Sequence, residues 1–483
     1  MSTDAVDLAD VQGLVRFGHG PLREAVFVLA RVKGVAAARS WLRSVPVSTA
    51  APTSSRPTTA LQVAITAHGL EALGVPPSIR AGFSPEFLEG MADANRARRL
   101  GDVGGNAPVQ WDWGYEKTVP HVVLMLFAKP GELGALVART CDEAWQGAFD
   151  ELRRLGTADL DGEEPFGFKD GISQPTVDWR QERDPSSSRH QYRKEVALGE
   201  FLLGYRNEYG KYTDRPLVGA DASSGGLPVA QDAPDKKDVG RNGTYLVMRQ
   251  LRQDVRGFWQ HLSREAGGDE KAADALAARL VGRTRKGDPL SHEQRTNDFT
   301  FDNDRAGVVC PVGAHIRRAN PRNSDYPNHE TGVRRLLADL GLPGSPFEDD
   351  LVSAVRFHRI LRRGREYGPS LALTEAMRPG PGDDPERGLH FVCLNANISR
   401  QFEFIQGAWL MSSTFAGLTG EGDPLLGHRQ RIAGGGETDG FTIQRDGLRQ
   451  RVSGLPPFVT MRGGAYFFLP GVRALRFLGG ASE

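Results

Sequence analysis

Short apolar runs separated by polar and glycine-rich segments recur along the chain, and their length is that of β-strands. Three runs in the first third predict strands, at residues 25–32, 61–67 and 119–128. The third, VPHVVLMLFA, is apolar almost throughout, which is typical of a strand buried on both faces. The first third of the chain therefore predicts a sheet with a well-buried centre.

Amphipathic segments between these runs predict helices at residues 34–42 and about 69–73. Pro130 suits a first helical turn and opens a predicted long amphipathic helix to about Leu155. Strands and helices in this order are typical of the split βαβ arrangement of ferredoxin-like domains.

The second half of the chain repeats this order as a pattern, though not as a sequence. Its predicted strands are residues 244–250, 355–361, 389–395 and 459–469. Its predicted helices are residues 254–266, 270–281 and 399–410. The intervening stretch is rich in Asp, Ser, Arg, Gly and Pro, which is typical of a long connection. We expect an α+β fold of two ferredoxin-like domains with antiparallel sheets, at 1–180 and 241–483, joined by an excursion at 181–240. A site between the domains is the ordinary arrangement.

The charges balance, with 60 Lys and Arg against 60 Asp and Glu. No net field would attract nucleic acid or an anionic membrane, so neither is an expected partner. No apolar run reaches the roughly 18 residues that span a bilayer. The cysteines Cys141, Cys310 and Cys393 are far apart, which argues against a disulfide framework or a zinc site. This use of cysteine, together with an acidic N-terminus that lacks signal-peptide features, predicts a cytoplasmic protein. The sequence leaves open whether the protein forms an oligomer.

The segment PFGFKDGISQP at 165–175 places Asp170 between glycines and aromatic residues. Glycines let the backbone bend and approach another group closely. Phe166 and Phe168 would desolvate whatever Asp170 faces, which raises a carboxyl pKa, so Asp170 is a candidate acid–base group. The simpler alternative is a turn in which Asp170 caps its own backbone.

His315 lies in CPVGAHIRRANPR, at 310–322. The small residues before it would let a flat group approach the imidazole, and the arginines after it could hold anions. No HExxH motif or closely spaced second ligand accompanies it, so it suits a single-ligand site better than a zinc site. A structural histidine is the alternative.

The segment ILRRGREYG at 360–368 is a basic strand end that runs into a turn. An arginine there, beside an apolar cavity, would stabilise developing negative charge. Leu389 and Phe391 lie on one face of the next strand and could wall such a cavity. The alternative for residues 360–368 is a solvated charged loop, and the alternative for Leu389 and Phe391 is an ordinary core strand. No P-loop, strand-coupled GxGxxG or GxSxG motif is present.

Taken in order, the segments GFKDG, AHIRRANPR, ILRRGREYG and GLHFVCLNANISRQFEFIQGAW resemble the dye-decolourising (DyP-type) haem peroxidases. The resemblance covers essentially the whole chain and is greatest to the longer cytoplasmic members. It implies an enzyme that reduces hydrogen peroxide through a ferryl intermediate and oxidises dyes, phenols or other one-electron donors. It also implies one haem b per chain, bound mainly by the C-terminal domain at the domain interface.

The resemblance also implies residue roles. Asp170 would transfer the proton of peroxide, and Arg362 would stabilise the charge that develops as the O–O bond breaks. Arg362 is preferred to Arg363 because of its distance from Gly368 in the family motif. The residues that would hold haem are His315 as iron ligand, Leu389 and Phe391 on the distal side, Arg322 at a propionate, and Glu403 as the carboxylate behind His315.

An aspartate that shuttles protons predicts an acidic pH optimum, shifted upward if Asp170 is strongly desolvated. Reductants too bulky for the pocket would give electrons to surface aromatics, for which the candidates are Trp179, Tyr326, Tyr367 and Trp409. Two alternatives stay open. A haem-handling or iron-release protein would bind haem with little turnover, and a non-enzymatic ferredoxin-like binding module would purify colourless.

Overall fold

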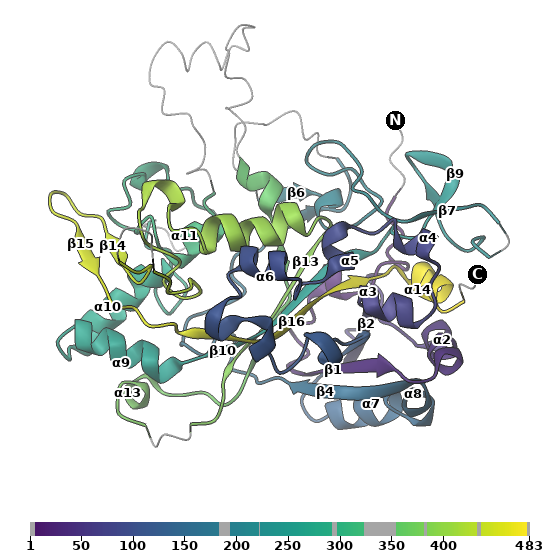
Figure 1. Ribbon diagram of the computed structural model, residues 1–483, viewed down its shortest axis with the longest axis horizontal. Helices are drawn as coiled ribbons and strands as arrows, with labels where there is room; N and C mark the ends of the chain where they lie inside the picture. Colours follow the sequence, from purple (N-terminus) through teal and green to yellow (C-terminus); the bar gives the residue numbers. More distant parts are fainter. Residues whose placement is uncertain are drawn as a thin grey trace, which may run out of the picture.

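The computed structural model describes residues 5–182, 194–221, 223–291, 297–322, 354–380, 384–431 and 436–480. Within these residues, the largest element is a sheet in which two antiparallel halves lie side by side (Figure 1). The first half contains β1 (Glu24–Val32), β2 (Thr59–Ile65), β3 (Val122–Ala128) and β4 (Phe149–Gly156). The second contains β10 (Thr244–Gln253), β11 (Leu361–Arg362), β12 (Arg365–Tyr367), β13 (Gly388–Asn395) and β16 (Val459–Leu469).

Both halves have the same strand order. The first runs β2-β3-β1-β4 and the second runs β11-β13-β10-β16, with β12 also paired to β13. In each half, the first and third strands in the chain are therefore the two central ones, and all of these neighbours are antiparallel. The predicted pair of ferredoxin-like antiparallel sheets is confirmed. The boundaries at residues 180 and 240 stay predictions.

The two half-sheets meet where β16 pairs with β2, through Phe468 and Ile65. Each face of the joined sheet carries a core that contains residues of both halves. Val28 and Val247 belong to one of these cores, and Phe27 and Leu246 to the other. Because both faces are covered, β3 is apolar and buried at every position, as its sequence indicated.

Helices α2 (Val35–Ser44), α3 (Ala67–Ala72), α7 (Leu133–Thr140) and α8 (Glu143–Ala148) pack on the first half-sheet (Figure 1). The prediction of one long helix from Pro130 to Leu155 is wrong. The first helix ends at Thr140, and Asp142 caps the next by accepting the backbone N–H of Trp145 at 3.1 Å. The residues after α8 pair with β1 as the edge strand β4, so sheet pairing overrides a helix-like sequence.

In the second half, α9 (Val255–Glu265) and α10 (Glu270–Val281) match prediction, and residues 399–410 are helical with π-type turns at Ser399–Glu403 and Ile405–Leu410. The strand predicted at 355–361 is wrong. Ala354–His358 is a 3-10 helix instead, because His358 stacks on Phe404 with ring centroids 3.7 Å apart and donates from Nδ1 to the carbonyl of Arg400. Within the predicted segment, only Leu361, the first residue of β11, pairs with the sheet.

The remaining elements surround this framework. They are α1 (Leu14–Phe17), α4 (Pro77–Arg80), α5 (Pro85–Glu89), α6 (Ala94–Leu100), α11 (His315–Ala319), α13 (Leu373–Ala376) and α14 (Val472–Leu478), the strands β5 (Thr176–Asp178), β6 (Glu195–Ala197), β7 (Leu217–Gly219), β8 (Val229–Ala230), β9 (Ala233–Asp238), β14 (Phe441–Ile443) and β15 (Gln450–Val452), and 3-10 turns at Gly104–Asn106, Pro108–Gln110, Glu116–Thr118, Leu198–Glu200, Asp302–Asp304 and Phe415–Gly417. The last helix, α14, packs on α2 at the start of the chain, where Arg476 donates to the carbonyl of Val45 at 2.6 Å (Figure 1).

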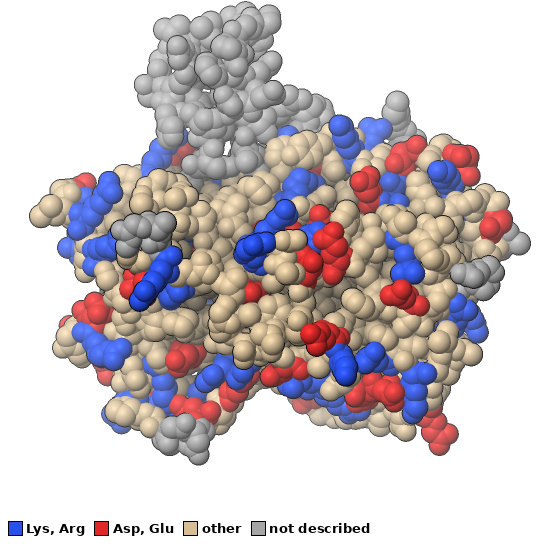
Figure 2. Space-filling view, in the orientation of Figure 1, with Lys and Arg blue, Asp and Glu red and all other residues tan. Residues whose placement is uncertain are grey.

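The surface shows no large area of one charge on the face drawn in Figure 2, where basic and acidic side chains are interspersed. This agrees with the balanced composition. None of the helices that the structure describes is long and apolar enough to cross a membrane.

Candidate active site

A cavity of about 290 Å³ lies where a loop from the first half crosses to the second. The loop leaves β4 and is held on the second half by backbone hydrogen bonds, from Ala158 N to Glu366 O at 2.7 Å and from Lys169 N to Arg285 O at 3.0 Å. Asp170 follows directly and lines the cavity. Pairing with the second half therefore brings Asp170 to residues that lie far along the chain.

Phe166 and Phe168 anchor this loop. Both are buried, and they pack on α9 against Phe258 and Trp259, with ring centroids 4.6 and 6.4 Å apart. The indole of Trp259 also donates to the carbonyl of Phe166 at 3.0 Å. Gly167 has a φ of 90°, which disfavours other residues and permits the sharp turn between the two rings. The aromatic residues thus position the loop as well as line the cavity.

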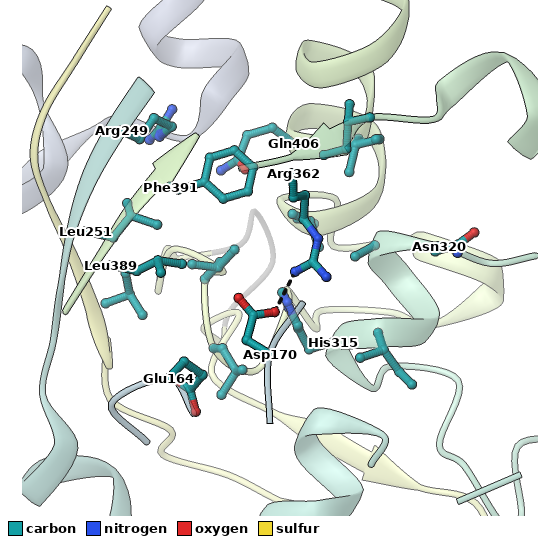
Figure 3. Close-up of a pocket in the computed structure, with 18 of the residues that line it drawn as sticks. Glu164, Asp170, Arg249, Leu251, His315, Asn320, Arg362, Leu389, Phe391 and Gln406 are labelled. Carbon is teal, nitrogen blue, oxygen red and sulfur yellow. Dashed lines mark hydrogen bonds and ion pairs between the residues drawn. The ribbon is translucent and has the colours of Figure 1, made fainter. Parts of the chain in front are cut away.

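Asp170 is paired with Arg362, Oδ1 to Nη1 at 2.9 Å (Figure 3). Each side chain keeps about 30% of its surface accessible, at 30% for Asp170 and 32% for Arg362, and both line the cavity. Burial raises the pKa of Asp170. The Arg362 guanidinium, the Gly171 N–H and His315 lower it by more, so the pKa lies below its ordinary value. The upward shift expected from the phenylalanines is therefore outweighed.

The arginine in the cavity is Arg362, whereas its neighbour Arg363 turns away. Arg363 donates from Nε to the carbonyl of Leu14 at 2.7 Å and from Nη2 to that of Val15 at 2.6 Å. Successive side chains on a strand point to opposite faces, which separates the two arginines. Gln174 holds the Arg362 backbone on both sides, accepting its N–H at 3.0 Å and donating to its carbonyl at 3.2 Å.

His315 begins α11 and also lines the cavity, close to Asp170 and Arg362 in the view of Figure 3. Its Nδ1 donates to Oδ2 of Asp423 at 3.0 Å. Burial lowers the pKa of the imidazole, but Asp423 more than compensates and raises it above its ordinary value. With the proton held on Nδ1, the Nε2 lone pair is available to a metal.

Asp423 is fully buried, and both of its oxygens have partners. Oδ1 accepts the backbone N–H groups of Leu425 and Leu426, each at 2.9 Å, while Oδ2 accepts from His315. The carboxylate expected behind His315 was Glu403, and that prediction is wrong. Glu403 accepts two hydrogen bonds from Nη1 of Arg96 at 3.0 Å and one from the Tyr466 hydroxyl at 2.9 Å.

No sequence signal singled out Asp423, which stands in an ordinary-looking Gly-Asp-Pro turn. Two further cavity residues were also missed. Glu164 lines the cavity, accepts from Gln253 Nε2 at 2.6 Å, and has its pKa raised to about 7 by burial. Arg283, after α10, lines the same cavity.

The other predicted residues line the cavity as well. Leu389 and Phe391 project from β13, beside Leu251 of β10 (Figure 3). Arg322 is buried, donates from Nη1 to the carbonyl of Phe299 at 2.8 Å, and stacks on the Phe299 ring at 3.8 Å. The small Gly313 before His315 does not border the open space. A side chain there would meet Leu418 and Phe441.

The aromatic residues proposed as electron donors are largely covered. Tyr367 and Trp409 are 8% and 9% exposed, and Trp179 packs against the core. Tyr326 lies outside the described residues. Trp409 contacts His358, a cavity residue, with ring centroids 5.3 Å apart.

The residues present fit a haem group. The imidazole of His315 lines the cavity, and its Nδ1 donates to the buried carboxylate of Asp423, which is how iron-ligating histidines are commonly held. Apolar side chains and an arginine–aspartate pair supply the remaining wall. Among the described residues, no group of three or more His, Cys, Asp or Glu is placed to hold a metal ion.

Comparison with known proteins gives the family. No family model matches the sequence. Among curated relatives, the chain is 30% identical to the dye-decolorizing peroxidase msp1 of Mycetinis scorodonius, over 98% of this chain and 88% of the relative. It is also 30% identical to the multifunctional dye peroxidase DyP2 of Amycolatopsis sp., over 95% and 91% of the two chains.

Solved structures agree. An ancestral D-type dye-decolorizing peroxidase is similar with a TM-score of 0.71 and 25% identity, over 98% of this chain and 99% of that one. The fungal DyP-type peroxidase of Auricularia auricula-judae has the same fold, with a TM-score of 0.70 and 24% identity over 99% and 100% of the two chains. With sequence relatives that match over nearly its full length and a cavity that suits haem, this chain belongs to the dye-decolorizing peroxidase family.

Proposed function

We propose that this peroxidase binds one haem b per chain through Nε2 of His315, and that Asp170 and Arg362, which line the same cavity, promote the cleavage of hydrogen peroxide. The observation that carries the proposal is that an aspartate–arginine ion pair and a carboxylate-bound histidine line one cavity. Most residues that line it belong to the second half of the chain, so that half would hold most of the group. When bound, haem would supply a redox-active iron.

Asp170 moves the proton. Its lowered pKa keeps the carboxylate ionised, so it can take a proton from one oxygen of hydrogen peroxide and return it to the other. The departing oxygen then leaves as water. The accessible surface of the Asp170 carboxylate, about a third of the side chain, lies on the cavity where peroxide would bind.

Arg362 orients Asp170 and stabilises charge. Its Nη1 bonds to Asp170, and Nη2 donates to the carbonyl of Ser173 at 3.3 Å, so the guanidinium is held from two sides. A permanently charged donor in this position stabilises the negative charge that builds up as the O–O bond breaks.

His315 and the apolar walls complete the site. Asp423 keeps the imidazole in the tautomer that presents a lone pair, and increases its donor strength. Leu389 and Phe391 exclude water from the side where peroxide is cleaved.

The proposed reductants are phenols, dyes and other one-electron donors. A structurally similar dye-decolorizing peroxidase was solved in complex with 2,6-dimethoxyphenol. Two one-electron donations, with two protons, balance the reduction of one hydrogen peroxide to two molecules of water. We also propose a cytoplasmic location, supported by three buried cysteines without disulfides among the described residues.

The test is the absorption spectrum of the purified protein before and after one equivalent of peroxide. The comparison includes wild type, Asp170→Ala, Arg362→Ala and the matched control Arg363→Ala. We expect a Soret band in all four, and a peroxide-dependent change that is slowed in the first two variants only. Loss of one transition-state donor corresponds to about 100- to 1,000-fold.

The outcomes separate the alternatives. Haem binding with no peroxide-dependent spectral change or turnover would favour haem handling or iron release. A colourless protein that stays without a Soret band after expression with added haem would overturn the proposal. Equal slowing in Arg362→Ala and Arg363→Ala would refute the assignment of Arg362.

A further inference from the structure

A second imidazole, that of His358, lines the cavity, and the mechanism above does not use it. His358 ends the 3-10 turn Ala354–His358, four residues before Arg362. Its ring stacks on Phe404, with centroids 3.7 Å apart and planes 5° apart, and it lies edge-to-face with Trp409 at 5.3 Å. These two aromatic contacts hold the imidazole in one orientation.

A hydrogen bond to Arg400 fixes the tautomer of this imidazole. Nδ1 of His358 bonds to the backbone carbonyl of Arg400. A carbonyl oxygen can only accept, so Nδ1 carries the proton and Nε2 carries the lone pair. None of the residues that the structure describes hydrogen-bonds to Nε2, so this lone pair is available to a ligand in the cavity.

His390 shows how His358 differs from a structural histidine that is held in the same way. Nε2 of His390 donates to the carbonyl of Gly156 at 3.0 Å, and its ring stacks on Tyr367 with centroids 4.5 Å apart. Burial lowers the pKa of both imidazoles to about 4, so both are neutral above that pH. The second nitrogen of His390, however, is buried without a partner and away from the cavity, whereas Nε2 of His358 is not enclosed in this way.

The cavity wall beside His358 is apolar. Phe404 and Trp409, which contact its ring, pack in a cluster whose other members also border the cavity. The members that line the cavity are Ala319, Ile360, Ile405, Leu410 and Met411. Ala319 follows His315 by four residues on α11, so the two lie on the same face of that helix. The apolar wall therefore extends from His358 to the helix face that carries the proposed iron ligand.

A single hydrogen-bond acceptor within apolar walls suits a ligand with an aromatic ring and a hydroxyl donor. A phenol has both. An anion fits less well, because a neutral imidazole that presents its lone pair cannot donate to it. Loss of an electron from a phenol that keeps its proton leaves a positive charge on the ring, which apolar walls do not stabilise. A base at the hydroxyl group removes this cost.

We propose that His358 binds the hydroxyl group of a phenolic reductant and takes its proton as the phenol is oxidised. The proposal rests on the function proposed above, in which the haem oxidised by peroxide is the electron acceptor. The O–H bond of the phenol breaks, its proton goes to Nε2, one electron goes to the oxidised haem, and a neutral phenoxyl radical leaves. The imidazolium then releases the proton. Two such oxidations deliver the two electrons and two protons that convert one hydrogen peroxide into two molecules of water.

The test compares two reductants of the holoenzyme. A phenol, 2,6-dimethoxyphenol, gives up a proton with its electron, whereas ferrocyanide gives up an electron alone. The variants are His358→Phe, which keeps the stack on Phe404 without a base, and His358→Gln, which can accept a hydrogen bond but cannot hold a proton. We expect kcat/KM for the phenol to fall about 100-fold in both variants, the lower range for a lost general base, and kcat/KM for ferrocyanide to stay unchanged.

The matched control is His390→Phe, which removes an imidazole with the same kind of carbonyl bond and ring stack outside the cavity. We expect wild-type kcat/KM for both reductants in this variant. The Soret band and the rate of the reaction with peroxide should match wild type in all three variants, because none of them changes His315, Asp170 or Arg362.

Binding to the resting enzyme is a second measurement, made by calorimetry with the same phenol and with its O-methyl ether. The ether keeps the ring and lacks the hydroxyl donor. We expect Kd for the phenol to rise about two- to tenfold in His358→Phe, the effect of one hydrogen bond, and Kd for the ether to stay the same. His358→Gln should bind the phenol more nearly as wild type does, although it does not oxidise it at the wild-type rate.

Equal losses with the phenol and with ferrocyanide in His358→Phe would overturn this role, because the residue would then support the fold or the cofactor only. Loss of the Soret band in His358→Phe would also overturn it, since His358 would then hold haem. Unchanged phenol oxidation in both His358 variants would overturn it and leave the proposed function intact. A wild-type protein that does not react with peroxide would instead overturn the proposed function, and the role of His358 with it.

Discussion

Replacing Asp423 with asparagine should weaken haem binding by changing the tautomer of His315. Each carboxylate oxygen of Asp423 has its own task. Oδ2 accepts from Nδ1 of His315 at 3.0 Å, and Oδ1 accepts the N–H groups of Leu425 and Leu426 at 2.9 Å. Asparagine has only one acceptor oxygen, so it cannot serve both sides.

The two orientations of the new amide have different costs. With its oxygen toward His315, the NH₂ group faces two buried N–H donors, and each unsatisfied donor costs about 1–3 kcal/mol, or roughly 2–6 kcal/mol together. With its oxygen toward the backbone, the NH₂ group donates to Nδ1, and the imidazole proton moves to Nε2. The second orientation avoids the larger cost, but a protonated Nε2 cannot bind iron.

The assay is haem loss to apomyoglobin together with the absorption spectrum and the thermal unfolding midpoint. We expect Asp423→Asn to lose haem about 10- to 100-fold faster, the usual range for a residue that orients a metal ligand. The midpoint of the apoprotein should change little. The matched control is Asp439→Asn, since Asp439 also accepts a backbone N–H, from Gly454 at 2.9 Å. Wild-type haem retention and spectrum in Asp423→Asn would refute the reasoning.

Three further predictions concern carboxylates in or near the cavity. Arg362→Leu removes the charge that holds the pKa of Asp170 below 3.8, and burial then raises the pKa of this carboxyl. The acid side of the pH–rate profile for the reaction with peroxide, measured by stopped flow, should therefore move to higher pH, and an unchanged profile would exclude Asp170 as the base. Burial raises the pKa of Glu164 from 4.5 to about 7 in the folded protein, so the free energy of unfolding should fall by about 3 kcal/mol as the pH rises between these values. In urea titrations at several pH values, Glu164→Gln should abolish this dependence on pH. The same pH dependence in Glu164→Gln as in wild type would contradict the assignment. Arg96→Leu removes the guanidinium that is paired with the buried carboxylate of Glu403, and it should lower the free energy of unfolding by about 3–5 kcal/mol in urea titrations. A loss below about 1 kcal/mol would mean that the ion pair contributes little to stability.

Much of the fold followed from local patterns. The run that became β3 is apolar at every position because both faces of the sheet are covered, and that condition is visible in the chain itself. The errors fell on segments whose conformation depends on distant partners. Residues 149–156 have a helix-like sequence, but pairing with β1 makes them a strand. Residues 354–358 form a 3-10 helix, with His358 stacked on Phe404.

The candidate site divides in the same way. Asp170 is flanked by glycines, His315 follows small residues, and Arg362 lies at a strand end. The residues next to each of them in the sequence therefore indicate a functional site. The structure brings all three to one cavity. The partner of His315 has no such setting, because Asp423 lies 108 residues further along the chain and meets it only through folding.

The chain alone predicted most elements with a strong apolar period, and it singled out Asp170, His315 and Arg362, to which we assign haem binding and peroxide cleavage. Only folding decided which carboxylate meets His315, which of two adjacent arginines enters the cavity, and where Arg283 lies. The physical reason is that periodicity and turn geometry act over a few residues, whereas an ion pair or a buried hydrogen bond depends on distance in space. Asp423 and Glu403 are equally acidic in sequence, and packing alone assigns one to His315 and the other to Arg96.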